Sequence, residues 1–120
     1  MFSILLFILT TTQQLVFNID SGSESRAATL NIGKLSRFDD TVSATFFINN
    51  NLENDITIYG IRSSCSCIKV ETKERSISPK DRLKVLVTYN NIGESKLPQI
   101  LYIYHSHSKK PLKIYITCDP

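Results

Sequence analysis

The stretch that decides the fold is ITIYGIRSSCSCIKV, residues 56–70. Residues 56–61 alternate, so the even-numbered side chains share one face of an extended chain and the odd-numbered ones share the other. Residues 62–64 interrupt the apolar pattern, and a second extended segment follows over residues 65–70, with both of its cysteines on one side. The stretch therefore predicts a strand, a corner and a second strand.

Short extended segments separated by turn residues make up the rest of the chain, and none shows the i, i+3, i+4, i+7 spacing of an amphipathic helix. Residues 49–55, NNNLEND, predict a turn because Asn and Asp bond to their own backbone. Pro79 predicts a tight turn at residues 77–81. About seven strands at this short spacing predict an all-β fold, an immunoglobulin-like antiparallel β-sandwich. The further strands are expected at residues 28–32, 42–49, 82–89, 100–104 and 112–117.

Alternate positions of these strands predict the hydrophobic core. The sequence has no Trp, and it lacks the well-spaced cysteine pair that joins the two sheets of antibody domains. The sandwich is therefore expected to lack a disulfide between its two sheets. The expected core residues are Leu30, Ile32, Phe46, Ile48, Ile56, Ile58, Leu83, Val85, Val87, Ile100, Tyr102, Leu112, Ile114 and Ile116.

Residues 1–25 are expected to be a signal peptide and polar leader, and residues 26–120 the folded domain. The apolar run FSILLFIL at residues 2–9 is shorter than the roughly 20 residues of a membrane-spanning helix. It has the length of the apolar part of a signal peptide. Cleavage signals are expected at Thr10-x-Thr12 or Ser21-x-Ser23. We therefore predict an exported protein, periplasmic or secreted, without a stable membrane span.

The composition argues against a nucleic-acid partner. The formal charge of +3 is spread over the chain, and Lys109-Lys110 is the only adjacent basic pair. Nucleic-acid binders instead concentrate basic residues on one face. The 120 residues are enough for one domain, which we expect to be a monomer.

Two pairs of residues are candidates for a metal site. Cys65 and Cys67 offer soft thiolate ligands for Cu(I) or Zn, and His105 and His107 offer ring nitrogens at the same i, i+2 spacing. The alternative is that the cysteines pack as small apolar side chains and that the histidines belong to a solvated turn. We expect no cofactor, because structural metal sites usually have a fuller ligand set.

The cysteines also bear on redox chemistry. Two residues apart in a regular strand, Cys65 and Cys67 would have Cα atoms about 6.6 Å apart, at the limit for a disulfide, so a bulge at Ser66 would be needed. If residues 56–61 pair with residues 100–104, and these with residues 112–116, Cys118 lies at the same end as Cys65 but two strands away. We therefore expect no bond from either cysteine to Cys118.

Catalysis is not expected. The chain has scattered Ser, His and Asp residues but no nucleophile elbow, and its adjacent carboxylates occur as Asp39-Asp40 in an expected loop. We predict a non-catalytic module with no catalytic residues. A small thiol-dependent metal-binding or redox protein is the alternative.

Several motifs together resemble the bacterial family called Domain of Unknown Function 1573. Phe46-x-Ile48-x-Asn50 resembles the end of a strand in that family, and Ser64-Cys65-Ser66-Cys67-Ile68 resembles its Ser-Cys-Gly-Cys-Thr motif. Ile77-Ser78-Pro79-Lys80 resembles its Ile-x-Pro-Gly turn, and Gly93 matches a loop glycine. The resemblance covers about residues 30–117.

Three positions depart from the family pattern: Ser66 and Lys80 replace Gly, and Ile68 replaces Thr. The resemblance implies an exported immunoglobulin-like domain, similar to modules of cilia- and centrosome-associated proteins and of major sperm protein. Those relatives bind proteins or assemble scaffolds. The implied partner is another envelope or secreted protein, bound through a sheet edge or face.

Overall fold

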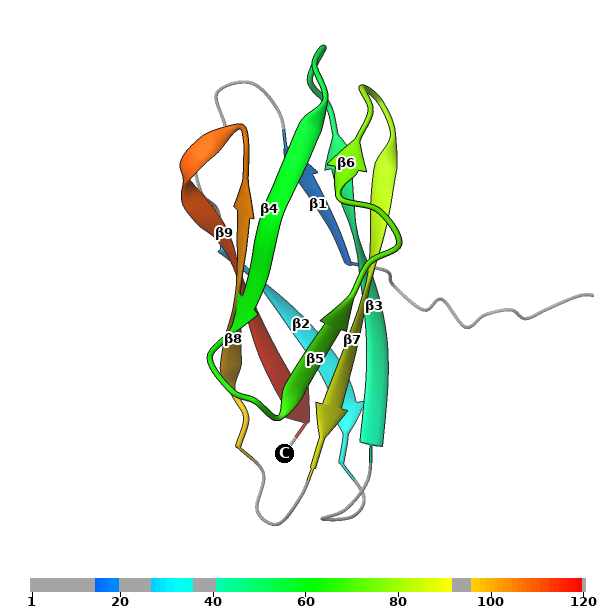
Figure 1. Ribbon diagram of the computed structural model, residues 1–120. Coiled ribbons are helices and arrows are strands. Elements are labelled where there is room, and N and C mark those ends of the chain that lie inside the picture. Colours follow the sequence, from blue (N-terminus) through cyan, green and yellow to red (C-terminus); the bar gives the residue numbers. More distant parts are fainter. Residues whose placement is uncertain (1–14, 20–26, 36–40, 92–95, 120) are drawn as a thin grey trace, which may run out of the picture.

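The computed structural model describes residues 15–19, 27–35, 41–91 and 96–119, which contain strands and no helix. Two sheets face each other across a hydrophobic core (Figure 1). The predicted all-β sandwich is confirmed, with nine strands in the described residues instead of about seven. They are β1 (Leu15–Ile19), β2 (Ala27–Lys34), β3 (Thr41–Asn50), β4 (Ile56–Ser63), β5 (Ile68–Glu71), β6 (Ser76–Ile77), β7 (Arg82–Asn90), β8 (Gln99–His105) and β9 (Ser108–Asp119).

The strands divide into a four-stranded sheet, β1-β3-β7-β5, and a five-stranded sheet, β2-β9-β8-β4-β6. Strand β8 pairs with both β4 and β9 in antiparallel orientation, as expected. Two edge strands differ from the prediction, because β1 runs parallel to β3 and β2 runs parallel to β9. Each sheet is therefore mixed.

Strand β1 lies within the segment that we expected to be leader. Its residues Phe17 and Ile19 are buried in the core, and the Phe17 ring meets Phe46 edge to face with centroids 6.4 Å apart. Residues 15–19 thus pack with the sandwich, ahead of the predicted domain start at residue 26.

The predicted core is wrong in strand β8. Leu101 and Ile103 are the fully buried residues, whereas Ile100 and Tyr102 lie on the outer face and are half-buried. Both faces of this strand are apolar, so alternation alone did not identify the inner one, and a shift of one residue exchanges the faces. Ile32 packs against the core but is also only half-buried.

A β-bulge in β4 also changes the expected alternation. Ile58 pairs with His105 and Gly60 with Tyr104, so the extra residue Tyr59 lies between these two pairs. Beyond the bulge, Ile61 packs against the core instead of facing outward. The bulge leaves Tyr59 66% exposed on the outer face.

Asn50 is a fully buried polar residue at the end of β3. Its Nδ2 donates to the carbonyl oxygens of Ile77 at 2.7 Å and Asn54 at 2.8 Å. Its Oδ1 accepts from the Leu52 N–H at 2.8 Å, and its backbone carbonyl accepts from the Lys80 N–H. These bonds join β3, the following turn, β6 and the turn before β7.

The turn predicted from Pro79 is confirmed. The Asp81 N–H donates to the Ser78 carbonyl at 3.0 Å. Lys80 has φ of 65°, as the third residue of a type II turn requires, and Gly usually occupies that position. The remaining motif residue of the loop after β7, Gly93, lies outside the described residues.

Asn50→Asp is expected to destabilise the fold by about 3 kcal/mol, because the carboxylate cannot donate to the carbonyls of Ile77 and Asn54 and is itself buried. Denaturant unfolding at pH 7 measures the loss. The matched control is Asn51→Asp at the exposed neighbouring residue, which should change the free energy of unfolding by less than about 0.5 kcal/mol. Equal losses in the two variants would contradict this role of Asn50.

Candidate functional site

The Cys-x-Cys motif forms a disulfide in a turn between β4 and β5. Cys65 and Cys67 are bonded, with Cα atoms 5.1 Å apart, which is shorter than the spacing expected for a regular strand. The expected extended segment begins at Ile68, because residues 64–67 form a bend and a turn. The turn brings the two Cα atoms within disulfide distance, which in a regular strand would require a bulge at Ser66.

Hydrogen bonds hold this turn against β8. The Ser64 N–H donates to the Ile100 carbonyl at 2.9 Å, and the Ile100 N–H donates to Ser64 Oγ at 2.8 Å. Ser63 Oγ accepts from the Cys65 N–H at 3.0 Å and donates to the Cys65 carbonyl at 2.8 Å. The Asn90 N–H donates to the Cys67 carbonyl, so the turn is tied to both sheets.

Cys118 is free and partly exposed. Neither Cys65 nor Cys67 bonds to it, which confirms the prediction made from the strand order. It lies near the end of β9, and the carboxyl end of the chain and the Cys65–Cys67 turn occupy the same end of the sandwich (Figure 1).

The four candidate metal ligands do not come together. The cysteines follow β4 near Ile100, at the start of β8, whereas His105 ends β8 and His107 lies in the hairpin after it. These places are opposite ends of the sandwich (Figure 1). Within the described parts of the chain, no three His, Cys, Asp or Glu side chains are arranged to hold a metal ion.

His105 is nearly fully buried on the core face of β8. Its Nδ1 accepts from the His107 N–H at 3.2 Å, and its Nε2 is buried without a hydrogen-bond partner among the described residues. Burial lowers the pKa of His105 below its ordinary value of 6.5, and the nearby His107 lowers it further. His105 therefore favours the neutral ring in the folded protein.

The titration of His105 predicts a loss of stability in acid. Because its folded pKa is below 6.5, the unfolded chain binds the proton more readily, and the stabilisation is complete above that pH and declines as the pH falls. Denaturant unfolding at pH 7.5 and pH 5 should show a smaller decline for His105→Gln than for the parent. His107→Gln, at the exposed neighbour, should retain most of the decline. An unchanged decline in His105→Gln would contradict the assignment.

The outer face of the five-stranded sheet carries four of the five tyrosines in the chain. Ile100, Tyr102 and Tyr104 alternate along β8, and the register places Tyr115 opposite Ile100. Tyr59 joins this group at the bulge of β4. We call these five residues the tyrosine face.

Two basic residues flank the tyrosine face. Tyr102 lies between Arg62 of β4 and Lys113 of β9 in the register, and both basic side chains are exposed. The carboxylate of Asp119, near the end of β9, accepts a 2.9 Å hydrogen bond from Asn31 Nδ2. The face therefore combines aromatic rings with positive charge.

The outer face of the four-stranded sheet is different. Its central strands present hydroxyl side chains, of which Ser43 and Thr88 lie within hydrogen-bond distance of each other at 3.3 Å. The Phe47 ring is covered by the Arg82 guanidinium, 5.0 Å from the ring centroid. Polar outer residues are usual for an antiparallel sheet, so the aromatic face is the exceptional one.

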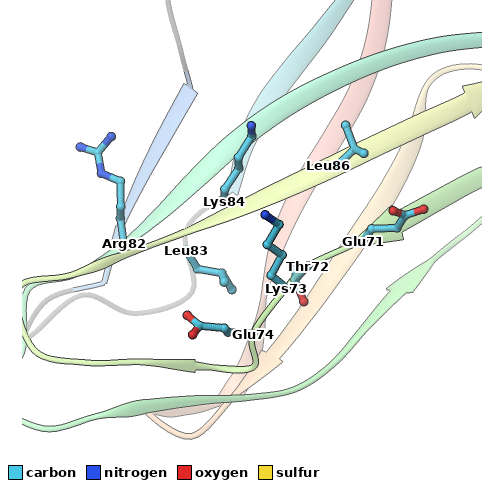
Figure 2. A pocket seen from close by; sticks show the side chains of 8 residues that line it. All are labelled: Glu71, Thr72, Lys73, Glu74, Arg82, Leu83, Lys84 and Leu86. Carbon is cyan, nitrogen blue, oxygen red and sulfur yellow. The ribbon is translucent and has the colours of Figure 1, made fainter.

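A hollow of about 720 Å³ lies at the free edge of β7 (Figure 2). Strand β5 pairs only with residues 86–89 of β7, and the chain then leaves this sheet toward β6. Leu83 and Glu74 approach each other across the hollow, and Lys73, Arg82 and Lys84 add charged side chains to its lining (Figure 2). Charged side chains along an edge oppose the addition of another strand, so the tyrosine face is the stronger candidate for binding.

The tyrosine face was missed in the sequence because Tyr102 was assigned to the core. One signal was available: Leu101 and Ile103 are aliphatic, whereas the opposite face of the same strand contains two tyrosines. A tyrosine combines an apolar ring with a hydroxyl that prefers a wet environment. That difference favours the aliphatic side as the inner one.

Comparison with known proteins gives one family. The family model described as "Protein of unknown function (DUF1573)" matches residues 24–119. A search of curated proteins finds no match. No helix in the described residues has the length and apolar character needed to cross a membrane.

Proposed function

We propose that this chain, which belongs to the DUF1573 family of unknown function, is a non-catalytic protein-interaction module that binds its partner through the tyrosine face. The observation that carries the proposal is the gathering of Tyr59, Tyr104 and Tyr115 on one sheet face, at 66%, 37% and 36% exposure. Aromatic residues and Arg are enriched at protein interfaces, and Tyr and Arg among the residues that contribute most binding energy.

The chemistry of the face indicates the partner. Arg62 and Lys113 flank Tyr102, and no carboxylate belongs to the five residues of the face. A complementary protein surface would have apolar side chains at its centre, to cover the aromatic rings, and acidic groups around them, to meet the basic residues. We therefore assign a folded protein with an acidic rim as the occupant, and not a second copy of this chain.

We further propose that the protein is exported and works in the cell envelope or outside the cell. The apolar run at residues 2–9 supports this proposal. Strand β1 adds a constraint, because removal of Phe17 and Ile19 would take two buried side chains from the core. Processing should therefore occur before Leu15.

Intact-mass measurement on protein recovered from the cell envelope or the medium tests this. We expect a mature chain that has lost the apolar run but retains β1, as cleavage at Thr10-x-Thr12 would leave it. Cleavage at Ser21-x-Ser23 would contradict the structural constraint on β1. Recovery of the full chain, starting at Met1, from the cytoplasm would contradict export itself.

Photo-cross-linking in the source cells tests the binding face. A benzophenone amino acid is placed at Tyr104, at Ser43 on the opposite sheet and at Lys84 beside the edge hollow. We expect a discrete product with another protein from position 104 alone. Arg62→Glu combined with Lys113→Glu should lower its yield by about tenfold or more, because like charges then face each other.

Circular dichroism of the charge-reversed variant provides the control, since both changed residues are exposed and the fold should persist. Products of equal yield from all three positions would contradict a specific face. A product with the mass of two copies of this chain would show that the face binds a second copy and not another protein. A product from Lys84 alone would assign binding to the edge of β7.

A further inference from the structure

We propose that the Cys65–Cys67 disulfide is redox-active and exchanges with the thiols of a second protein, with Cys67 Sγ as the atom attacked and Cys65 as the leaving thiolate. This inference goes beyond the binding function. It rests on four features of the turn: the hydrogen bonds that anchor it, the different surroundings of its two sulfur atoms, the short loop that the disulfide closes, and its exposure.

The turn is anchored independently of the disulfide. Ser64 exchanges two hydrogen bonds with the backbone of Ile100, and Ser63 Oγ bonds to both the N–H and the carbonyl of Cys65. None of these bonds involves a sulfur atom. The two thiols would therefore remain close together after reduction and be able to re-form their bond.

The two sulfur atoms differ in their surroundings. The Cys67 N–H donates a hydrogen bond to Cys65 Sγ at 3.1 Å. A donor at this position stabilises negative charge on Cys65 when the disulfide is broken, and a sulfur that leaves as a more stable thiolate leaves faster.

The loop closed by the disulfide is too short for the bond to contribute much to the stability of the fold. The loss of entropy that a cross-link imposes on the unfolded chain grows with the logarithm of the loop length. A separation of two residues therefore gives one of the weakest stabilising effects that a disulfide can have. Chemical exchange accounts for the pair better than stability does.

The disulfide is also within reach of a partner. Cys65 and Cys67 are both partly exposed, and their turn lies at one end of the sandwich (Figure 1). Cys67 also packs against the hydrophobic core, so we expect the attacking thiolate to approach it from the exposed side of the turn.

The reaction balances as a dithiol–disulfide exchange. A partner thiolate forms a bond to Cys67 Sγ, the Cys65–Cys67 bond breaks, and its electron pair moves to Cys65. A second thiolate of the partner then attacks the partner sulfur of the mixed disulfide and releases Cys67, so the partner gains a disulfide and this chain becomes a dithiol. A small-molecule or protein disulfide reoxidises the dithiol by the same exchange, in which that compound is reduced.

Glutathione serves as the probe, with the full chain carrying Cys118→Ser so that two cysteines remain. After incubation at several ratios of reduced to oxidised glutathione, the mixture is quenched with acid and analysed by peptide mass spectrometry. We expect the fraction of dithiol to follow the ratio while the circular dichroism spectrum stays unchanged. Trapped glutathione should be found on Cys67 about tenfold more often than on Cys65, the factor expected for one hydrogen bond to a charged sulfur.

Two single variants in the same Cys118→Ser background test which of the two sulfur atoms is the more stable thiolate. Cys65 in Cys67→Ser keeps the N–H donor of residue 67 and should be alkylated by iodoacetamide at pH 7 about tenfold faster than Cys67 in Cys65→Ser. A disulfide that resists every glutathione ratio, a spectrum that collapses on reduction, or glutathione mainly on Cys65 would each overturn the proposal. Equal alkylation rates would overturn the assignment of the leaving thiolate.

Discussion

The side chain of Asn50 joins the end of β3 to the turn that follows it and to β6 through three hydrogen bonds. A buried amide is favourable only when its donors and acceptor are satisfied, and the carbonyls of Asn54 and Ile77 and the N–H of Leu52 meet this requirement. The partners belong to the turn after β3 and to β6, which lies in the opposite sheet. The amide therefore fixes how one end of each sheet meets the other.

The hydrogen bonds of Asn50 and the bulge in β4 together decide which residues of β4 face outward and which face the core. Ile56 of β4 pairs with Ile77 of β6, whose carbonyl accepts from Asn50, so the first half of β4 is set by the same network. The bulge then adds Tyr59 to the outer face and returns Ile61 to the core. One extra residue thus both completes the aromatic surface and keeps the second half of the strand packed.

Much of this fold is predictable because strands with one polar face reveal their period. Strand β7 is an example: Leu83, Val85 and Val87 are buried as the alternation predicts. Strand β8 is apolar on both faces, so its inner side is decided by the packing of the two sheets, which the local sequence does not contain.

Strand β1 was missed for a different reason. Its sequence LVFNI follows an apolar run, and the two together were interpreted as one leader. The disulfide was missed because the cysteine spacing was evaluated for a regular strand, whereas residues 64–67 leave the extended conformation. The anchoring of that turn depends on Ile100, which is distant in sequence.

Ile100 links the binding proposal to the thiol proposal. Its backbone holds Ser64 at the Cys65–Cys67 turn, and its side chain lies on the tyrosine face opposite Tyr115. A protein bound on that face would lie beside the disulfide, and a thiol at its margin would react as an intramolecular group. The effective concentration of such a tethered group reaches the millimolar range, so a modest affinity at the face would make exchange selective for the bound partner.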